Sequence, residues 1–127
     1  MHEKHLYEYA VIRVVPRVEC EEFINVGLLL FCKRQKYLRA QIRVNEDKFK
    51  IFPTELDIEQ LQINLRSFEL ISKGAKNGGP IAQFEVSERF RWLSAVRSSC
   101  IQTSRPHSGF SEDLDKTFET LFDELIG

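Results

Sequence analysis

Three stretches in the first third of the chain have the hydrophobic pattern of β-strands. Residues 6–15 carry apolar or aromatic side chains on both faces, which predicts that both faces are covered. Residues 23–31 are also apolar on both faces, which predicts a central position in a sheet. Residues 37–44 alternate between apolar and polar side chains, so one face belongs to the core. Because the links between these stretches are short, the pattern predicts an antiparallel meander.

Most of the remaining chain has helical spacing. Residues 45–52 predict a short helical turn that Pro53 ends, and residues 54–57 supply a cap for a helix from 58 to about 73. The glycine-rich segment 73–80 predicts the end of that helix and a loop.

The C-terminal third predicts two more helices and one more strand. Ser87 is expected to cap a helix that ends near Val96, and residues 99–104 predict a fourth strand. Ser111 is expected to cap the last helix. The apolar positions of that helix form one core stripe, made by Leu114, Phe118, Leu121, Phe122 and Leu125.

The order of these elements predicts the α+β class. We expect an antiparallel sheet of about four strands, beginning with the three-strand meander, and three to four helices packed on one face of it. The sequence shows neither an internal repeat nor a shift in composition, so residues 1–127 are predicted to form a single domain.

Composition and charge narrow the function classes. The net charge is −1 and the pI is near 6.3, which gives no general attraction to nucleic acid or to an anionic membrane. The sequence has no signal-peptide pattern, and its three cysteines fit neither a disulfide framework nor a zinc site, so we expect a soluble cytoplasmic protein. Residues 111–127 carry six acidic side chains and one basic one. This acidic last helix is either a solvated outer face or a docking surface for a basic partner.

A polar group inside the second predicted strand is the first candidate site. Asn25 and Gly27 interrupt an apolar stretch that begins after Glu22. One interpretation is a β-bulge held by Asn25. The other is a pocket into which Glu22 and Asn25 point, with Gly27 allowing close approach of a ligand.

An arginine cluster is the second candidate site. Arg89, Arg97 and Arg105 lie within 17 positions, and arginine forks hold carboxylates and phosphates bidentately. The alternative is that they pair with acidic side chains of the same chain. His107 lies next to this cluster and could act as a general base, as could Glu22.

Two further features bear on binding. The polar face of the third predicted strand presents Tyr37, Arg39 and Arg43 to water or to a partner. The sequence lacks a phosphate-binding glycine loop, a dinucleotide fingerprint and a paired-histidine metal motif, so we predict neither a cofactor nor a metal.

Several segments together resemble domain-of-unknown-function family 3037. They are YAVIRVVP at 9–16, EFINVG at 22–27, ERFRWL at 88–93 with Arg97, and Gly109 ahead of a closing acidic helix. The resemblance implies a small bacterial cytoplasmic protein without an assigned activity, often encoded beside a HipA-like serine/threonine kinase. Its motif residues would be Glu22, Asn25, Arg89 and Arg97, with His107 and Asp113 matching less closely.

Three hypotheses on function follow. The first is an interaction module, a regulatory partner of such a kinase, which docks through the Arg39/Arg43 face and the acidic last helix. The second is a small enzyme or binding protein for a phosphate-bearing or nucleotide ligand, which requires that Glu22, Asn25, Arg89, Arg97 and His107 converge in one pocket. The third is single-stranded nucleic-acid binding through Tyr37, Arg39 and Arg43, against which the near-neutral charge counts.

Overall fold

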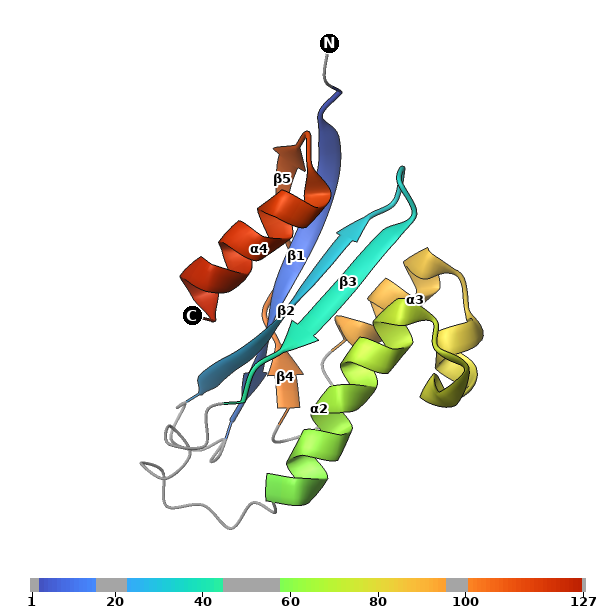
Figure 1. The fold of residues 1–127 in the computed structure, drawn as a ribbon, viewed down its shortest axis with the longest axis vertical. Coiled ribbons are helices and arrows are strands. Elements are labelled where there is room, and N and C mark those ends of the chain that lie inside the picture. The colour runs from blue at the N-terminus through green and yellow to red at the C-terminus, as the bar shows by residue number, and fades with distance from the viewer. Residues whose placement is uncertain (1–2, 16–22, 45–57, 96–100, 127) are drawn as a thin grey trace.

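A five-stranded antiparallel sheet lies between helices on its two faces (Figure 1). The computed structural model describes residues 3–15, 23–44, 58–95 and 101–126. The strands are β1 (His5–Val14), β2 (Ile24–Cys32), β3 (Tyr37–Ile42), β4 (Ile101–Thr103) and β5 (His107–Ser111). The α-helices are α2 (Ile58–Lys73), α3 (Val86–Leu93) and α4 (Leu114–Leu125). This arrangement confirms the α+β class.

The predicted meander is present, with strand order β3-β2-β1. In the β1–β2 pair, Ile12 lies opposite Gly27 but Arg13 lies opposite Asn25, so Val26 is the extra residue of a bulge. A side chain at position 27 would collide with β3, because a Cβ there would lie 2.6 Å from Cδ1 of Ile42 and 2.7 Å from the backbone oxygen of Gln41. The predicted bulge is therefore confirmed, and Gly27 serves close strand packing. That Asn25 holds the bulge stays a prediction.

Helices cover both faces of the sheet, and the prediction that they share one face is wrong. On one face, β2 packs Val26, Leu29 and Phe31 against α2 and α3, with the rings of Phe31 and Phe90 stacked 4.5 Å apart. On the other face, Leu28, Leu30 and Cys32 pack against α4. The physical reason is that a strand with apolar side chains on both faces needs a cover on each.

The far edge of β1 carries two short strands. β4 corresponds to the predicted fourth strand, and β5 was not predicted. Ile12 pairs with Thr103, whereas Tyr9 pairs with His107, so Arg105 and Pro106 both fall opposite Ala10 as a second bulge. Pro106 and Gly109 are residues typical of a loop, which is why the sequence did not predict β5. The segment is a strand because β1 pairs with it along its length.

Helix α2 has the predicted bounds, and the other helices differ from prediction in their caps. The N-cap of α3 is Glu85, not Ser87, and α3 ends at Leu93. The N-cap of α4 is Asp113, whose carboxylate accepts a hydrogen bond from the backbone N–H of Lys116. Ser111 instead accepts one from the backbone N–H of Asp113. The loop after α2 contains two 3-10 turns, Lys76–Gly78 and Pro80–Gln83. The helical turn and cap predicted at 45–57 lie outside the described residues.

The contact at Gly27 generates a stability prediction. Because the β3 backbone cannot move away cheaply, we expect Gly27→Ala to destabilise the fold by about 1–3 kcal/mol. Urea unfolding followed by circular dichroism measures this, with Gln62→Ala on the exposed side of α2 as the control. Equal stabilities of the two variants would contradict the close approach of β3.

Candidate functional site

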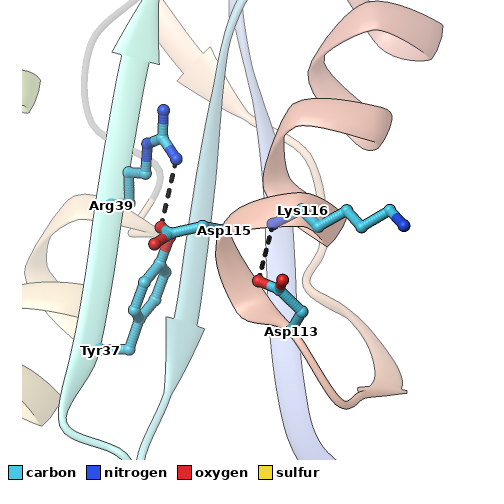
Figure 2. A network of polar contacts seen from close by, with 5 residues as sticks. All are labelled: Tyr37, Arg39, Asp113, Asp115 and Lys116. Carbon is cyan, nitrogen blue, oxygen red and sulfur yellow. Dashed lines mark hydrogen bonds and ion pairs between the residues drawn. The ribbon is translucent and has the colours of Figure 1, made fainter.

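Helix α4 is held on the sheet by an apolar stripe and a polar clamp. Leu114, Phe118 and Phe122 are buried against β2, which confirms the predicted core stripe. Beside them, Oδ1 of Asp115 accepts a hydrogen bond of 2.6 Å from the Tyr37 hydroxyl and one of 3.3 Å from Nη1 of Arg39 (Figure 2). We call Tyr37, Arg39 and Asp115 the α4 clamp.

Two arginines, Arg39 in β3 and Arg43 just after its end, extend this contact along the helix. The guanidinium of Arg39 lies 4.2 Å from the centre of the Phe118 ring, and that of Arg43 lies 4.8 Å from the centre of the Phe122 ring. Each such contact contributes about 0.5–1 kcal/mol when it is partly exposed. The Arg39–Asp115 ion pair adds little, because the Asp115 side chain is 70% exposed. The clamp therefore orients α4, and burial of the apolar stripe supplies most of the free energy that holds the helix on the sheet.

Tyr37 is the most perturbed titratable group among the described residues. Burial raises the pKa of its hydroxyl, and the hydrogen bond to the Asp115 carboxylate raises it further, to about 12. The pKa of Tyr7 is raised as well, first by burial and then by the neighbouring Tyr9. Both hydroxyls are therefore neutral donors at physiological pH.

A polar hollow of about 940 Å³ lies beside the first turn of α4. Its walls come from the start of β1, the turn between β2 and β3, and residues 111–121. Three carboxylates line it, those of Glu112, Asp113 and Asp115, together with the two tyrosines Tyr7 and Tyr37. The lining has three carboxylates but only one lysine, Lys116, and one histidine, His5. The hollow therefore has an acidic character and suits a basic or hydrogen-bonding group.

The residues predicted as an interaction surface face α4 of the same chain. Tyr37, Arg39 and Arg43 do lie together, as their alternation on the strand indicated. In the structure they contact Asp115, Phe118 and Phe122, so this face is occupied rather than open. Their use by another protein or by a nucleic acid stays a prediction.

Arg89, predicted as a ligand-binding residue, contacts the end of α2. Its Nη1 donates hydrogen bonds of 3.0 and 2.9 Å to the backbone oxygens of Ile71 and Ser72. These are carbonyls of the last helical turn, where the helix offers too few N–H donors, and a cation there also suits the helix dipole. The carbonyl of Ile71 also accepts a hydrogen bond of 3.1 Å from the backbone N–H of Gly74. Nη1 of Arg89 lies 3.1 Å from the place that a Cβ at Gly74 would occupy, so the absence of a side chain at Gly74 makes room for it. The left-handed backbone of Gly74 is a second reason for glycine at this position.

The predicted ligand and catalytic residues Asn25, Arg105 and His107 lie apart from Arg89. Nδ2 of Asn25 donates to the backbone oxygen of Leu125 at the end of α4, at 3.4 Å. His107 is exposed on β5, with its ring centre 5.3 Å from that of Tyr9, and Arg105 is exposed in the second bulge. Glu22 and Arg97 lie outside the described residues.

Asn25, Arg89 and His107 do not form a common pocket. Arg89 belongs to the α2/α3 side of the sheet, whereas Asn25 lies on the α4 side. His107 pairs with β1 at the opposite edge from Asn25. Of the five residues that the enzyme hypothesis brings together, the structure thus places three apart. Within the described ranges there is also no group of three or more His, Cys, Asp or Glu side chains that could hold a metal ion.

Sequence reasoning missed Asp115 and Tyr7. Asp115 is one of six acidic side chains in the last segment, and nothing in its local pattern distinguishes the one that meets Tyr37 across 78 positions. Tyr7 lies over Gly109, where a Cβ would be 2.5 Å from the Tyr7 Oη. The isolated glycine was the available signal, because a glycine in a strand indicates close approach of another group.

The role of Arg89 can be separated from ligand binding. We expect Arg89→Met to destabilise the fold by about 1–3 kcal/mol, because two buried carbonyls lose a charged donor. Arg91→Met, at an exposed position two residues away, is the matched control and should change stability by less than about 0.5 kcal/mol. Thermal unfolding measures both. Equal melting temperatures for the wild type and the Arg89 variant would exclude the capping role.

Tyr37 generates a prediction on alkaline stability. Its pKa is higher in the folded than in the unfolded chain, so its contribution is complete below pH 10 and decreases as the pH rises from 10 to about 12. We expect Tyr37→Phe to lower the free energy of unfolding by about 0.5–1.5 kcal/mol at neutral pH. Above pH 10 the variant should lose less further stability than the wild type does. Urea unfolding at several pH values tests this, and equal losses in both proteins between pH 10 and 12 would contradict it.

Comparison with known proteins adds the family. No curated protein and no solved structure matches the chain. A family model with the description "Protein of unknown function (DUF3037)" matches residues 9–126. The match begins within β1 and ends after α4, so it includes the whole sheet core and all the helices described above. The chain therefore belongs to the DUF3037 family.

Proposed function

We propose that the protein is an interaction module that binds a basic surface of a partner protein through the outer face of α4. The observation that carries the proposal is the acidic face of α4, together with the acidic hollow beside its first turn. Glu112, Glu119, Asp123 and Glu124 are all exposed. In the part of the chain that the structure describes, Asp115 is the one acid of α4 that forms an ion pair.

The geometry of α4 supports a protein partner. Its 12 residues extend over about 18 Å, which is long enough to contribute one side of a protein interface. The apolar stripe and the clamp hold the helix in one orientation, so its exposed carboxylates keep fixed positions. Like charges arranged in this way accelerate association with a surface of opposite charge and select against acidic partners.

The family resemblance supplies a partner to test first. We propose a HipA-like serine/threonine kinase in the cytoplasm, with the present protein as its regulatory subunit. In the residues that the structure describes, no helix is both long and apolar enough to span a membrane.

Charge reversal on α4 tests the proposal. The tagged protein is used to isolate partners from the lysate of its own host, and the partner found is then purified and its affinity measured. We expect Glu119→Lys/Asp123→Lys to weaken binding at least tenfold, with a larger difference at about 0.05 M than at about 0.5 M salt.

The matched control is Glu59→Lys/Glu88→Lys, which makes the same charge change at exposed positions of α2 and α3. This control should bind as the wild type does. If both double variants bind equally well, or if the partner binds through an acidic surface, the proposal is overturned. Recovery of the kinase identifies the partner, and recovery of another basic protein retains the docking surface but excludes the kinase.

A further inference from the structure

Strand β5 forms an edge of the sheet. It pairs with β1 along His107–Ser111, and no described residue forms a backbone hydrogen bond with its outer side. In Figure 1 it lies beside the first half of β1, partly behind the start of α4. Helix α4 meets β5 through the hydroxyl pair of Thr117 and Ser111, but among the described residues no backbone hydrogen bond joins the helix to this edge. An edge strand with unpaired backbone groups is a template for another strand.

Apolar and aromatic side chains lie on both faces of this edge, and the polar pair Glu8 and Ser108 shares the face of Phe110. Phe110 and Leu6 are directly opposite each other in the β1–β5 pair, and they are 68% and 53% exposed. On the α4 side, Tyr7 covers Gly109 and the ring of Tyr9 contacts that of His107. No Lys, Arg, Asp or Glu occurs from 106 to 111, so the strand lacks the charges that commonly keep edge strands apart.

The charges at the two ends of the strand are opposite. Arg105 precedes it, and Glu112 and Asp113 follow it, and all three are exposed. A second copy of the same strand in the antiparallel direction would therefore place each Arg105 beside the acidic end of the other copy. A parallel arrangement would place like charges together. This strand is thus complementary to itself in one direction only, and that complementarity identifies the occupant of the edge.

We propose that two copies of this chain associate through antiparallel pairing of their β5 strands, around a two-fold axis near Gly109. In this register Phe110 of one copy lies opposite Ser108 of the other, and the two Phe110 rings are diagonal neighbours, which is within reach of aromatic side chains. The five-residue strands and the two Leu6–Phe110 pairs form a small interface. Small interfaces give weak dimers, so we expect a dissociation constant of about 1–100 µM.

Sedimentation equilibrium of the full chain over about 5–500 µM measures the association. The wild type should pass from monomer to dimer in this range. Phe110→Ser should weaken the dimer at least tenfold, whereas Ile63→Ser, at a position 63% exposed on α2, should leave it unchanged. Hydrogen exchange provides a second measurement, because the outer amides of β5 should become protected as the concentration rises.

Charge reversal separates this interface from any other. Arg105→Glu should weaken self-association, because both ends of the strand are then acidic. Glu112→Arg should weaken it less, because Asp113 stays acidic and lies opposite Arg105 of the other copy in this register. A mixture of the two variants should associate more tightly than Arg105→Glu alone, because in the mixed dimer one pair of strand ends keeps the wild-type charges and the other pair gains a positive charge at position 112. All the substituted side chains are exposed, so the melting temperatures should stay close to that of the wild type.

The possible outcomes are distinct. A protein that stays monomeric up to 500 µM, or a dimer that neither Phe110→Ser nor the charge variants weaken, overturns the proposal. So does protection of the β5 amides only when a different protein is added. The α4 variant Glu119→Lys/Asp123→Lys should dimerise as the wild type does. Loss of partner binding through α4 can therefore be distinguished from loss of dimerisation through β5.

Discussion

The apolar character of both faces of β2 is the constraint on which the rest of the structure depends. Every residue of this strand except Asn25 is buried. A buried leucine side chain stabilises a fold by about 1.5–3 kcal/mol, so neither face of the strand can be left to water. Helices α2 and α3 cover one face, and α4, about 90 positions later in the chain, must return to cover the other. The three-layer arrangement follows from this one strand.

The polar groups that sequence motifs single out serve this arrangement. Arg89 binds the last carbonyls of α2, Asn25 contacts the last turn of α4, and Tyr37 binds its first turn. A residue type suited to a ligand is equally suited to the unpaired backbone groups at a helix end. The same residue type in a sequence therefore fits either a ligand-binding role or a role in pairing with a helix end. Only the position of the group that it contacts in the structure distinguishes the two roles.

The periodic elements were predictable and the long-range pairings were not. The meander, α2 and the stripe of α4 each follow from a repeat of two or 3.6 residues within one segment. The apolar side chains on both faces of residues 6–15 and 23–31 also indicated a helix layer on each face of the sheet. The prediction that all helices lie on one face conflicts with that pattern. Strand β5 is short and follows a bulge that contains Pro106, and its pairing depends on β1 about 100 positions earlier. The match of Tyr37 with Asp115 likewise has no local pattern.

A short link connects the β5 edge to the acidic helix. Ser111 is the last residue of β5, and its hydroxyl accepts a hydrogen bond from the N–H of Asp113 and shares another with the hydroxyl of Thr117. Both partners belong to the start of α4, whose Asp115 lies in the clamp with Tyr37. The position of the edge strand therefore fixes the first turn of α4, and with it the direction of the helix's exposed carboxylates. The β5 edge and the acidic face of α4 are thus ordered by one set of hydrogen bonds.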